Sequence, residues 1–155
     1  MSEKPAQPTQ KFAVQRVYIK DLSFESPQSP EVFTKQWKPQ IKVDLNTRSG
    51  DMKDNRVEVV LTITITATQD EATGFLVEVQ QAGQFLIEGL NDEQMQQVLA
   101  IACPNMLFPY AREAIDSLVT RGGFPAVNLQ PVNFEALFLQ ARKQAATESG
   151  QATTH

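Results

Sequence analysis

The sequence has few of the residues that most catalytic and metal sites need. Among its 155 residues there is one cysteine, Cys103, and one histidine, His155, at the last position. A single cysteine excludes an internal disulfide, and a zinc site of Cys and His ligands cannot be assembled from these two residues. A Ser–His or Cys–His nucleophilic pair would have to use the terminal histidine. We therefore expect no catalytic residues and no bound metal.

Nucleotide-binding motifs and an excess of positive charge are also missing. No glycine-rich loop ends in Lys-Ser or Lys-Thr, and no GxSxG, HExxH or EF-hand motif occurs. Fourteen Lys and Arg residues against eighteen Asp and Glu residues give a net charge of −4, which argues against nucleic-acid binding. The expectation is a protein that is not an enzyme, needs no cofactor and does not hydrolyse ATP.

Long apolar runs are the third absence. No uncharged apolar stretch approaches the roughly 20 residues of a membrane-spanning helix. The first residues, MSEKPAQPTQK, are polar and unlike a signal peptide. These features predict a soluble, cytoplasmic protein without direct membrane insertion.

The length of the chain fits a single domain with a core of ordinary size. Residues 1–11 are rich in Pro, Gln and Thr and are expected to form a flexible N-terminal arm. Residues 144–155 are small and polar, and predict a disordered C-terminal tail. The folded domain should therefore span residues 12–143.

The first half of this domain predicts four strands. Residues 12–25 combine β-branched and aromatic residues with only partial alternation, which indicates a strand with a bulge or a twist. Residues 26–39 contain three prolines and predict a long irregular crossover. Alternation of apolar and polar residues then indicates three further strands: 41–45, 56–68 and GFLVEVQQ at 74–81.

The second half predicts helices. After an interruption at Gly83 and an irregular continuation, Asp92 can cap a helix that ends at Pro104. The next helix ends at Arg121, which two glycines follow, and Asn133 can cap the last helix. Strands followed by helices predict an α+β fold with a four-stranded antiparallel sheet packed against C-terminal helices.

Two surfaces are candidates for binding, and the first is acidic. Alternation places Asp21 and Glu25 on one side of the first strand, and Leu76 and Glu78 on one side of the fourth. If both strands lie in one sheet, these residues form a negative patch around an exposed leucine, which suits a basic partner. A solvated sheet face is the alternative, and the pattern alone favours it.

The second candidate surface is aromatic. Large rings occur in the crossover and around the last connection, at Phe33, Trp37, Phe124, Phe134 and Phe138. They could border an apolar groove that holds an extended peptide. The alternative, again favoured by the pattern alone, is that the rings close the sides of the core.

Several segments together resemble the SecB family of bacterial protein-export chaperones. The most specific are CPNMLFPYARE at 103–113 and PVNFEALF at 131–138, in this order and at this spacing. The similarity covers roughly residues 12–140. The other matching segments are RVYIKDLSFESPQSPEVF at 16–33, KQWKPQIKVDL at 35–45 and FLVEVQQAGQF at 75–85.

This resemblance implies a function that the patterns do not name. It implies a homotetramer, a dimer of dimers, that keeps unfolded precursor proteins in the cytosol and delivers them to SecA, the translocase motor, without ATP. It assigns binding of the basic, zinc-binding C-terminal tail of SecA to the acidic patch, and so reverses the preference for a solvated face. The residues implied for SecA binding are Asp21, Glu25, Leu76 and Glu78, and those implied for client binding are Trp37, Ile41, Val43, Leu45 and Phe138.

Two other functions stay open at this point. One is a SecB-like chaperone dedicated to a single partner, as in a toxin–antitoxin system. The other is an oligomeric module that binds a small apolar ligand in the aromatic pocket. Binding to unfolded protein would separate the last alternative from both chaperone functions.

Overall fold

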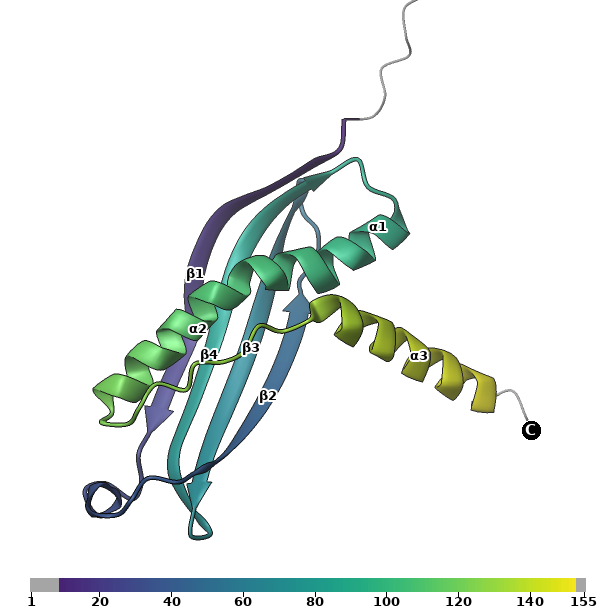
Figure 1. The fold of residues 1–155 in the computed structure, drawn as a ribbon. Helices are drawn as coiled ribbons and strands as arrows, with labels where there is room; N and C mark the ends of the chain where they lie inside the picture. Colours follow the sequence, from purple (N-terminus) through teal and green to yellow (C-terminus); the bar gives the residue numbers. More distant parts are fainter. Residues whose placement is uncertain (1–8, 153–155) are drawn as a thin grey trace, which may run out of the picture.

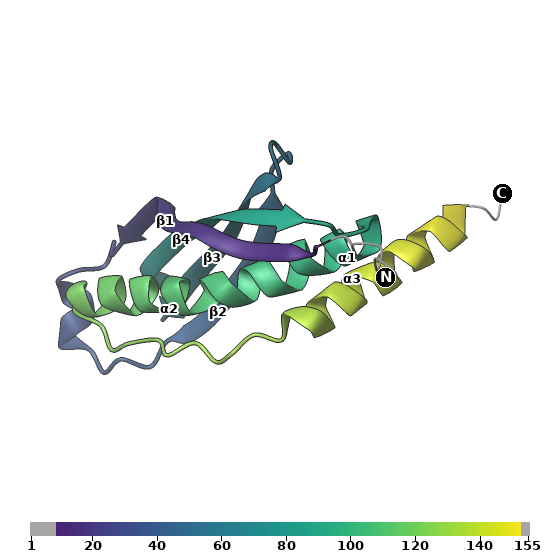
Figure 2. The same ribbon diagram turned by 90° about the horizontal axis from the view of Figure 1, so that it is seen from above.

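The computed structural model describes residues 9–152 as one antiparallel four-stranded sheet with helices on one face (Figures 1 and 2). The strand order is β1-β4-β3-β2, so β1 and β2 are the edge strands. The predicted α+β fold is confirmed. The elements are β1 (Lys11–Glu25), η1 (Glu31–Thr34, 3-10), β2 (Gln40–Ser49), β3 (Arg56–Gln69), β4 (Ala72–Glu88), α1 (Asp92–Gln97), η2 (Val98–Ala102, a π-helical turn), α2 (Cys103–Arg121) and α3 (Phe134–Ala152).

The centre of the sheet supplies most of the core. The alternate residues of β3 predicted to share one face are buried there beneath α2, and β4 adds Phe75, Val77, Val79 and Phe85 to the same layer. Cys103 is fully buried in this core. The core residues of β3 are Val57, Val59, Leu61, Ile63, Ile65 and Ala67.

Two bulges explain the partial alternation of β1. Its pairing with β4 shifts between Val14 and Arg16 and again between Ile19 and Asp21. Each bulge adds one residue, which reverses the side of the sheet that even-numbered positions face. The apolar residues therefore stay on the helix side along the whole strand, despite their irregular spacing. The predicted bulge is confirmed.

The fourth strand continues through Gly83, where the sequence predicted an interruption. A β-carbon at this position would lie 2.8 Å from the Phe85 ring and 3.0 Å from Leu107. Glycine is therefore present to admit these two core side chains, and the strand pairing is maintained on both sides of it.

The helical half also differs from the prediction at two points. Asn91 caps α1 in place of Asp92: its side chain accepts from the Gln94 backbone N–H, and the Gln94 side chain accepts from the Asn91 N–H. Pro104 does not end the helix, because the wider turn η2 precedes it and Cys103 N–H bonds to the Val98 carbonyl. A π-helical turn lets the chain pass the proline ring without a break.

The last helix begins where the sequence predicts and ends later. The Asn133 side chain accepts from Ala136 N–H at 2.9 Å, and α3 then continues to Ala152, through most of the segment expected to be disordered. The alanine- and glutamine-rich sequence favours a helix even where it is exposed. Residues 153–155, and residues 1–8 of the expected arm, lie outside the described part; residues 9 and 10 precede β1, which starts at Lys11.

No helix between residues 9 and 152 is long and apolar enough to cross a membrane.

Candidate binding surfaces

The four residues of the acidic patch lie together on the open face of the sheet. Glu25 pairs with Leu76 and Ser23 with Glu78 across the β1–β4 ladder, which puts their side chains on the same side. Their strand neighbours Phe75 and Val77 are buried under α2, so this side faces away from the helices. The second bulge of β1 also brings Asp21, opposite Gln80, to the open face.

Two details of this patch go beyond the sequence pattern. Leu76 is half-buried, whereas the pattern predicted an exposed leucine. Glu78 accepts a hydrogen bond from the Thr64 hydroxyl at 2.9 Å, which holds its carboxylate in place on the sheet. The arrangement is a fixed carboxylate beside an apolar side chain, flanked by two exposed carboxylates of β1.

A polar network beside the patch was not predicted. Lys20, at the second bulge of β1, donates to Glu58 Oε1 at 2.6 Å, and the Tyr18 hydroxyl donates to Glu58 Oε2. These bonds, the Lys20 bond first, lower the pKa of the Glu58 carboxyl. Burial and the bond to Glu58 raise the pKa of Tyr18 to about 12. The Lys20 amine is therefore paired with Glu58 and not with the carboxylate of its neighbour Asp21.

The predicted client-binding residues of β2 form an exposed apolar strip. Ile41, Val43 and Leu45 pair with the buried residues of β3, so they lie on the helix side of the sheet. Ile41 is 43% exposed and Val43 is 44% exposed, because no helix of the described chain covers this edge. The other edge of the β2 backbone has no neighbouring strand within residues 9–152.

This strip leads into an apolar groove between β2 and α3. The groove has a volume of about 480 Å³, and Leu45 and Phe138 both line it. Two predicted client-binding residues therefore meet there, and the groove also contains residues that the sequence did not single out. These include Leu99 from η2 and Leu137 from α3, and Phe134 of the predicted aromatic surface lines the groove as well.

Trp37 lies apart from this groove, in an aromatic cluster under the crossover. Its ring is 4.8 Å from Phe124 and 6.0 Å from Phe75, and Phe33 lies 5.3 Å from Phe124. The aromatic set predicted as one surface is therefore two: a cluster around Phe124 that closes the core, and the Phe134–Phe138 wall of the groove. The first set corresponds to the alternative that the sequence left open.

A second apolar strip, on the helix side of β1, was also not predicted as a surface. Ile19 is 48% exposed, and on the neighbouring helix Tyr110 is 54% exposed. Apolar side chains that share this exposed region of β1 and α2 are Phe12, Val14, Leu22 and Met106.

The described residues were compared with the requirements of a metal site and of a reactive thiol. Among them, no three His, Cys, Asp or Glu side chains are placed to hold a metal ion. Burial raises the pKa of the Cys103 thiol to about 12, which keeps it protonated and unreactive.

Comparison with known proteins identifies the family. A family profile described as "Preprotein translocase subunit SecB" matches residues 5–145. The chain belongs to the SecB family. The resemblance seen in the sequence is therefore confirmed, and the family is one of protein-export chaperones.

Two similar SecB proteins align with nearly the whole chain. Protein-export protein SecB of Hahella chejuensis is 55% identical over 152 residues, 97% of this chain and 94% of the relative. Protein-export protein SecB of Marinobacter nauticus is 53% identical over 148 residues, 93% of this chain and 90% of the relative.

A solved structure shares the fold at low sequence identity. The Mycobacterium tuberculosis SecB-like chaperone Rv1957, in complex with a ChAD peptide from the HigA1 antitoxin, matches with a TM-score of 0.63 and 14% identity. The match covers 78% of this chain and 87% of that chain. It supports the sheet-and-helix architecture described above.

Proposed function

We propose that this chain is an ATP-independent holdase that binds unfolded precursor proteins in the cytoplasm and delivers them to SecA for export. The family relationship supports the role in protein export. Within the molecule, the observation that most supports the proposal is a continuous apolar surface. The exposed strip of Ile41 and Val43 continues through Leu45 into the groove at Phe138.

This surface has the chemistry that an extended, non-native segment needs. Alternate side chains of a client can rest on the apolar strip, and the free backbone edge of β2 can bond to the client backbone. Such contacts recognise any segment with exposed apolar residues and do not require a particular sequence, because main-chain hydrogen bonds are independent of residue type. Many weak contacts from several subunits add up to a stable complex.

The acidic patch supplies a separate docking site for SecA. Glu78 and its neighbours Asp21 and Glu25 would attract the basic tail of the motor, and Leu76 would supply an apolar contact. The zinc belongs to the tail of the partner. Because the patch lies on the open face and the groove on the helix face, the chain can bind client and motor together.

The exposed apolar strip of β1 and α2 is the proposed interface between subunits. The exposed strip of β1 and α2, around Ile19 and Tyr110, is the kind of apolar surface that monomers seldom leave uncovered. A homotetramer built as a dimer of dimers would bury it. It would leave β2 and α3 of each subunit free for clients.

Binding of one precursor in two states tests the holdase function. The precursor is presented chemically unfolded and then folded, without nucleotide, and its affinity for the chain is measured by titration calorimetry. We expect tight binding to the unfolded form only. Equal binding to both forms, or none, would contradict the proposal, and affinity for a small apolar compound instead would favour the ligand-binding module.

A panel of unrelated precursors separates a general holdase from a chaperone with one dedicated partner. The general holdase should bind several unfolded precursors with similar affinity. Binding to one of them alone would favour the dedicated chaperone.

A further inference from the structure

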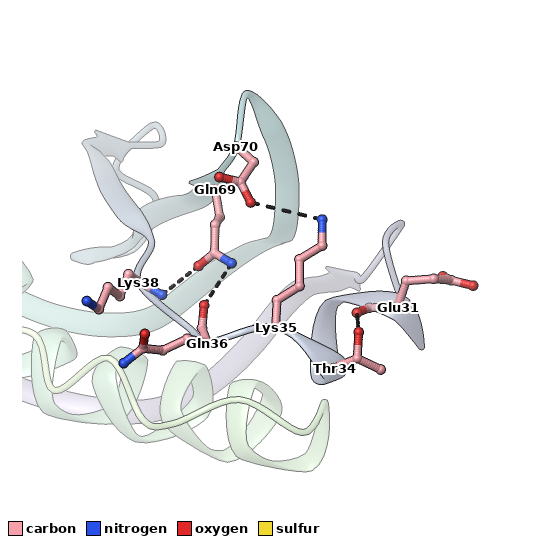
Figure 3. Close-up of polar contacts among 7 residues, drawn as sticks. All are labelled: Glu31, Thr34, Lys35, Gln36, Lys38, Gln69 and Asp70. Atoms are coloured by element: carbon pink, nitrogen blue, oxygen red, sulfur yellow. Dashed lines mark hydrogen bonds and ion pairs between the residues drawn. The ribbon is translucent and has the colours of Figure 1, made fainter.

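Gln69, the last residue of β3, connects the crossover to the sheet through both ends of its side-chain amide (Figure 3). Its Oε1 accepts from the Lys38 backbone N–H at 2.5 Å, and its Nε2 donates to the Gln36 carbonyl at 3.0 Å. The amide thus pairs with the crossover as a strand backbone would, one residue before and one residue after Trp37.

Trp37 itself is held by the aromatic cluster. Its ring approaches Gly74 of β4 so closely that a β-carbon there would lie 2.6 Å from Trp37 Cη2. It also packs at 4.8 Å from Phe124, the third residue of the connection between α2 and α3. The position of Trp37 therefore affects both the start of β2 and the start of this connection.

We infer that Gln69 is a positioning residue for client binding, which it supports by fixing Trp37 and the crossover. The inference rests on the proposed function. The strip on β2 and the groove wall on α3 come from segments that diverge from the Trp37–Phe124 contact. If the crossover shifts, the spacing between the two sides of the client surface changes with it.

Both amide atoms are required for this role. A glutamate at this position would place a carboxylate oxygen against the Gln36 carbonyl and lose the donor. An ion pair between Lys35 and Asp70 lies beside the two Gln69 hydrogen bonds. It spans 4.0 Å with both side chains largely exposed, so it adds little. The amide of Gln69 is the stronger link between the crossover and the β3–β4 hairpin.

The fluorescence of Trp37 provides a direct test, because it is the only tryptophan of the chain. Gln69→Met keeps the length of the side chain and removes both hydrogen bonds. In the full-length protein without client we expect Trp37 emission to shift to longer wavelength and acrylamide quenching to rise about two-fold. Affinity for an unfolded precursor should fall about five-fold.

Gln40→Met is the matched control. The Gln40 side chain lines the same polar pocket as Gln69, takes no part in the two Gln69 hydrogen bonds, and alternates with Ile41, so it faces away from the apolar strip of β2. Emission, quenching and affinity should stay at the wild-type values in this variant. Unchanged Trp37 emission and quenching in Gln69→Met would overturn the inference, as would altered emission with unchanged client affinity. If the wild type itself binds no unfolded precursor, the proposed function fails, and the emission change alone still reports whether Gln69 positions Trp37.

Discussion

The two edge strands present similar apolar side chains in different surroundings. On β1, Ile19 is 48% exposed and lies with the exposed apolar residues of α2, while the other face of the strand carries Asp21 and Glu25. On β2, Val43 is 44% exposed and leads to an apolar groove, while the other face has Lys42 and Asp44 within 3.7 Å of each other.

This comparison shows that exposure alone does not assign a role to an edge. A broad apolar strip beside a long helix suits a second copy of the chain, which can cover it permanently. A narrow strip with a free backbone edge suits a segment that binds and leaves. The acidic residues differ in the same way: Asp44 of β2 lies 3.7 Å from Lys42, whereas no described cation lies within 4 Å of Asp21 or Glu25 of β1.

Reversing one charge next to β1 should have the largest effect. Glu78→Lys places a cation at the centre of the acidic patch, and we expect SecA binding to become undetectable while client binding is unchanged. Asp44→Lys makes the same change beside the other edge and should leave SecA binding within about two-fold. Surface plasmon resonance with the SecA tail would measure both, and loss of binding in both variants would contradict the separate roles.

An acidic residue in each apolar strip should separate assembly from client binding. Ile19→Glu would bury a carboxylate in the proposed subunit interface and should dissociate the tetramer. Ile41→Glu should leave the tetramer intact and weaken client binding by about 1–2 kcal/mol. Analytical ultracentrifugation and client titration distinguish them, and an intact tetramer with Ile19→Glu would show that β1 is not the interface.

A change between the two edges should lower stability without affecting either role selectively. Gly83→Ala would force a methyl group against Phe85 and Leu107, and we expect it to reduce the free energy of unfolding by about 1–3 kcal/mol. Gly50→Ala, where the nearest atom is 3.9 Å from the added carbon, should be nearly neutral. Urea denaturation at one protein concentration measures both variants.

Two aromatic residues near β2 should differ in what their loss affects. Phe138→Ala removes a groove residue and should weaken client binding by about 1 kcal/mol without a change in stability. Trp37→Ala removes a core contact and should lower stability by about 3 kcal/mol as well. Equal loss of stability in both would place Phe138 in the core.

The smallest effect should be a pH dependence of the ion pair beside β1. The pKa of Glu58 is lowered in the folded chain, so its stabilisation is present above the unfolded pKa of about 4.3 and is lost as the pH falls through the folded value. Because Lys20 and Glu58 are 41% and 34% exposed, we expect at most about 1 kcal/mol at pH 7. The difference in free energy of unfolding between wild type and Glu58→Gln should be smaller at pH 3 than at pH 7, and an equal difference at both pH values would contradict the prediction.

Much of the fold could be predicted from residue alternation, because period-two patterns state which face is buried. This holds for β3, and it holds for Glu78 and Leu76, whose shared side follows from their place on one strand. The sequence of β1 indicated a bulge, but not its positions. Those positions decide which face Asp21 occupies, and they follow from pairing with β4.

Local rules failed where a tertiary contact outweighed them. Gly83 predicted an interruption of the strand, but the side chains of Leu107 and Phe85 occupy the space that a β-carbon there would need. Pro104 predicted the end of a helix, but the π-helical turn before it lets the helix continue. The sequence could not assign each aromatic residue to the core cluster or to the groove wall. Whether Trp37 or Phe138 faces the core depends on how the crossover and α3 pack.

Hydrogen exchange of the full-length protein with two ligands tests the division between the edges most directly. An unfolded precursor and the SecA tail are added separately, and protection is read along Gln40–Ser49 of β2 and Lys11–Glu25 of β1. We predict that the precursor protects β2 and the start of α3, and that the tail protects the end of β1 and its partner Leu76–Gln80 on β4. Protection of β1 by the precursor with β2 unchanged would contradict the account.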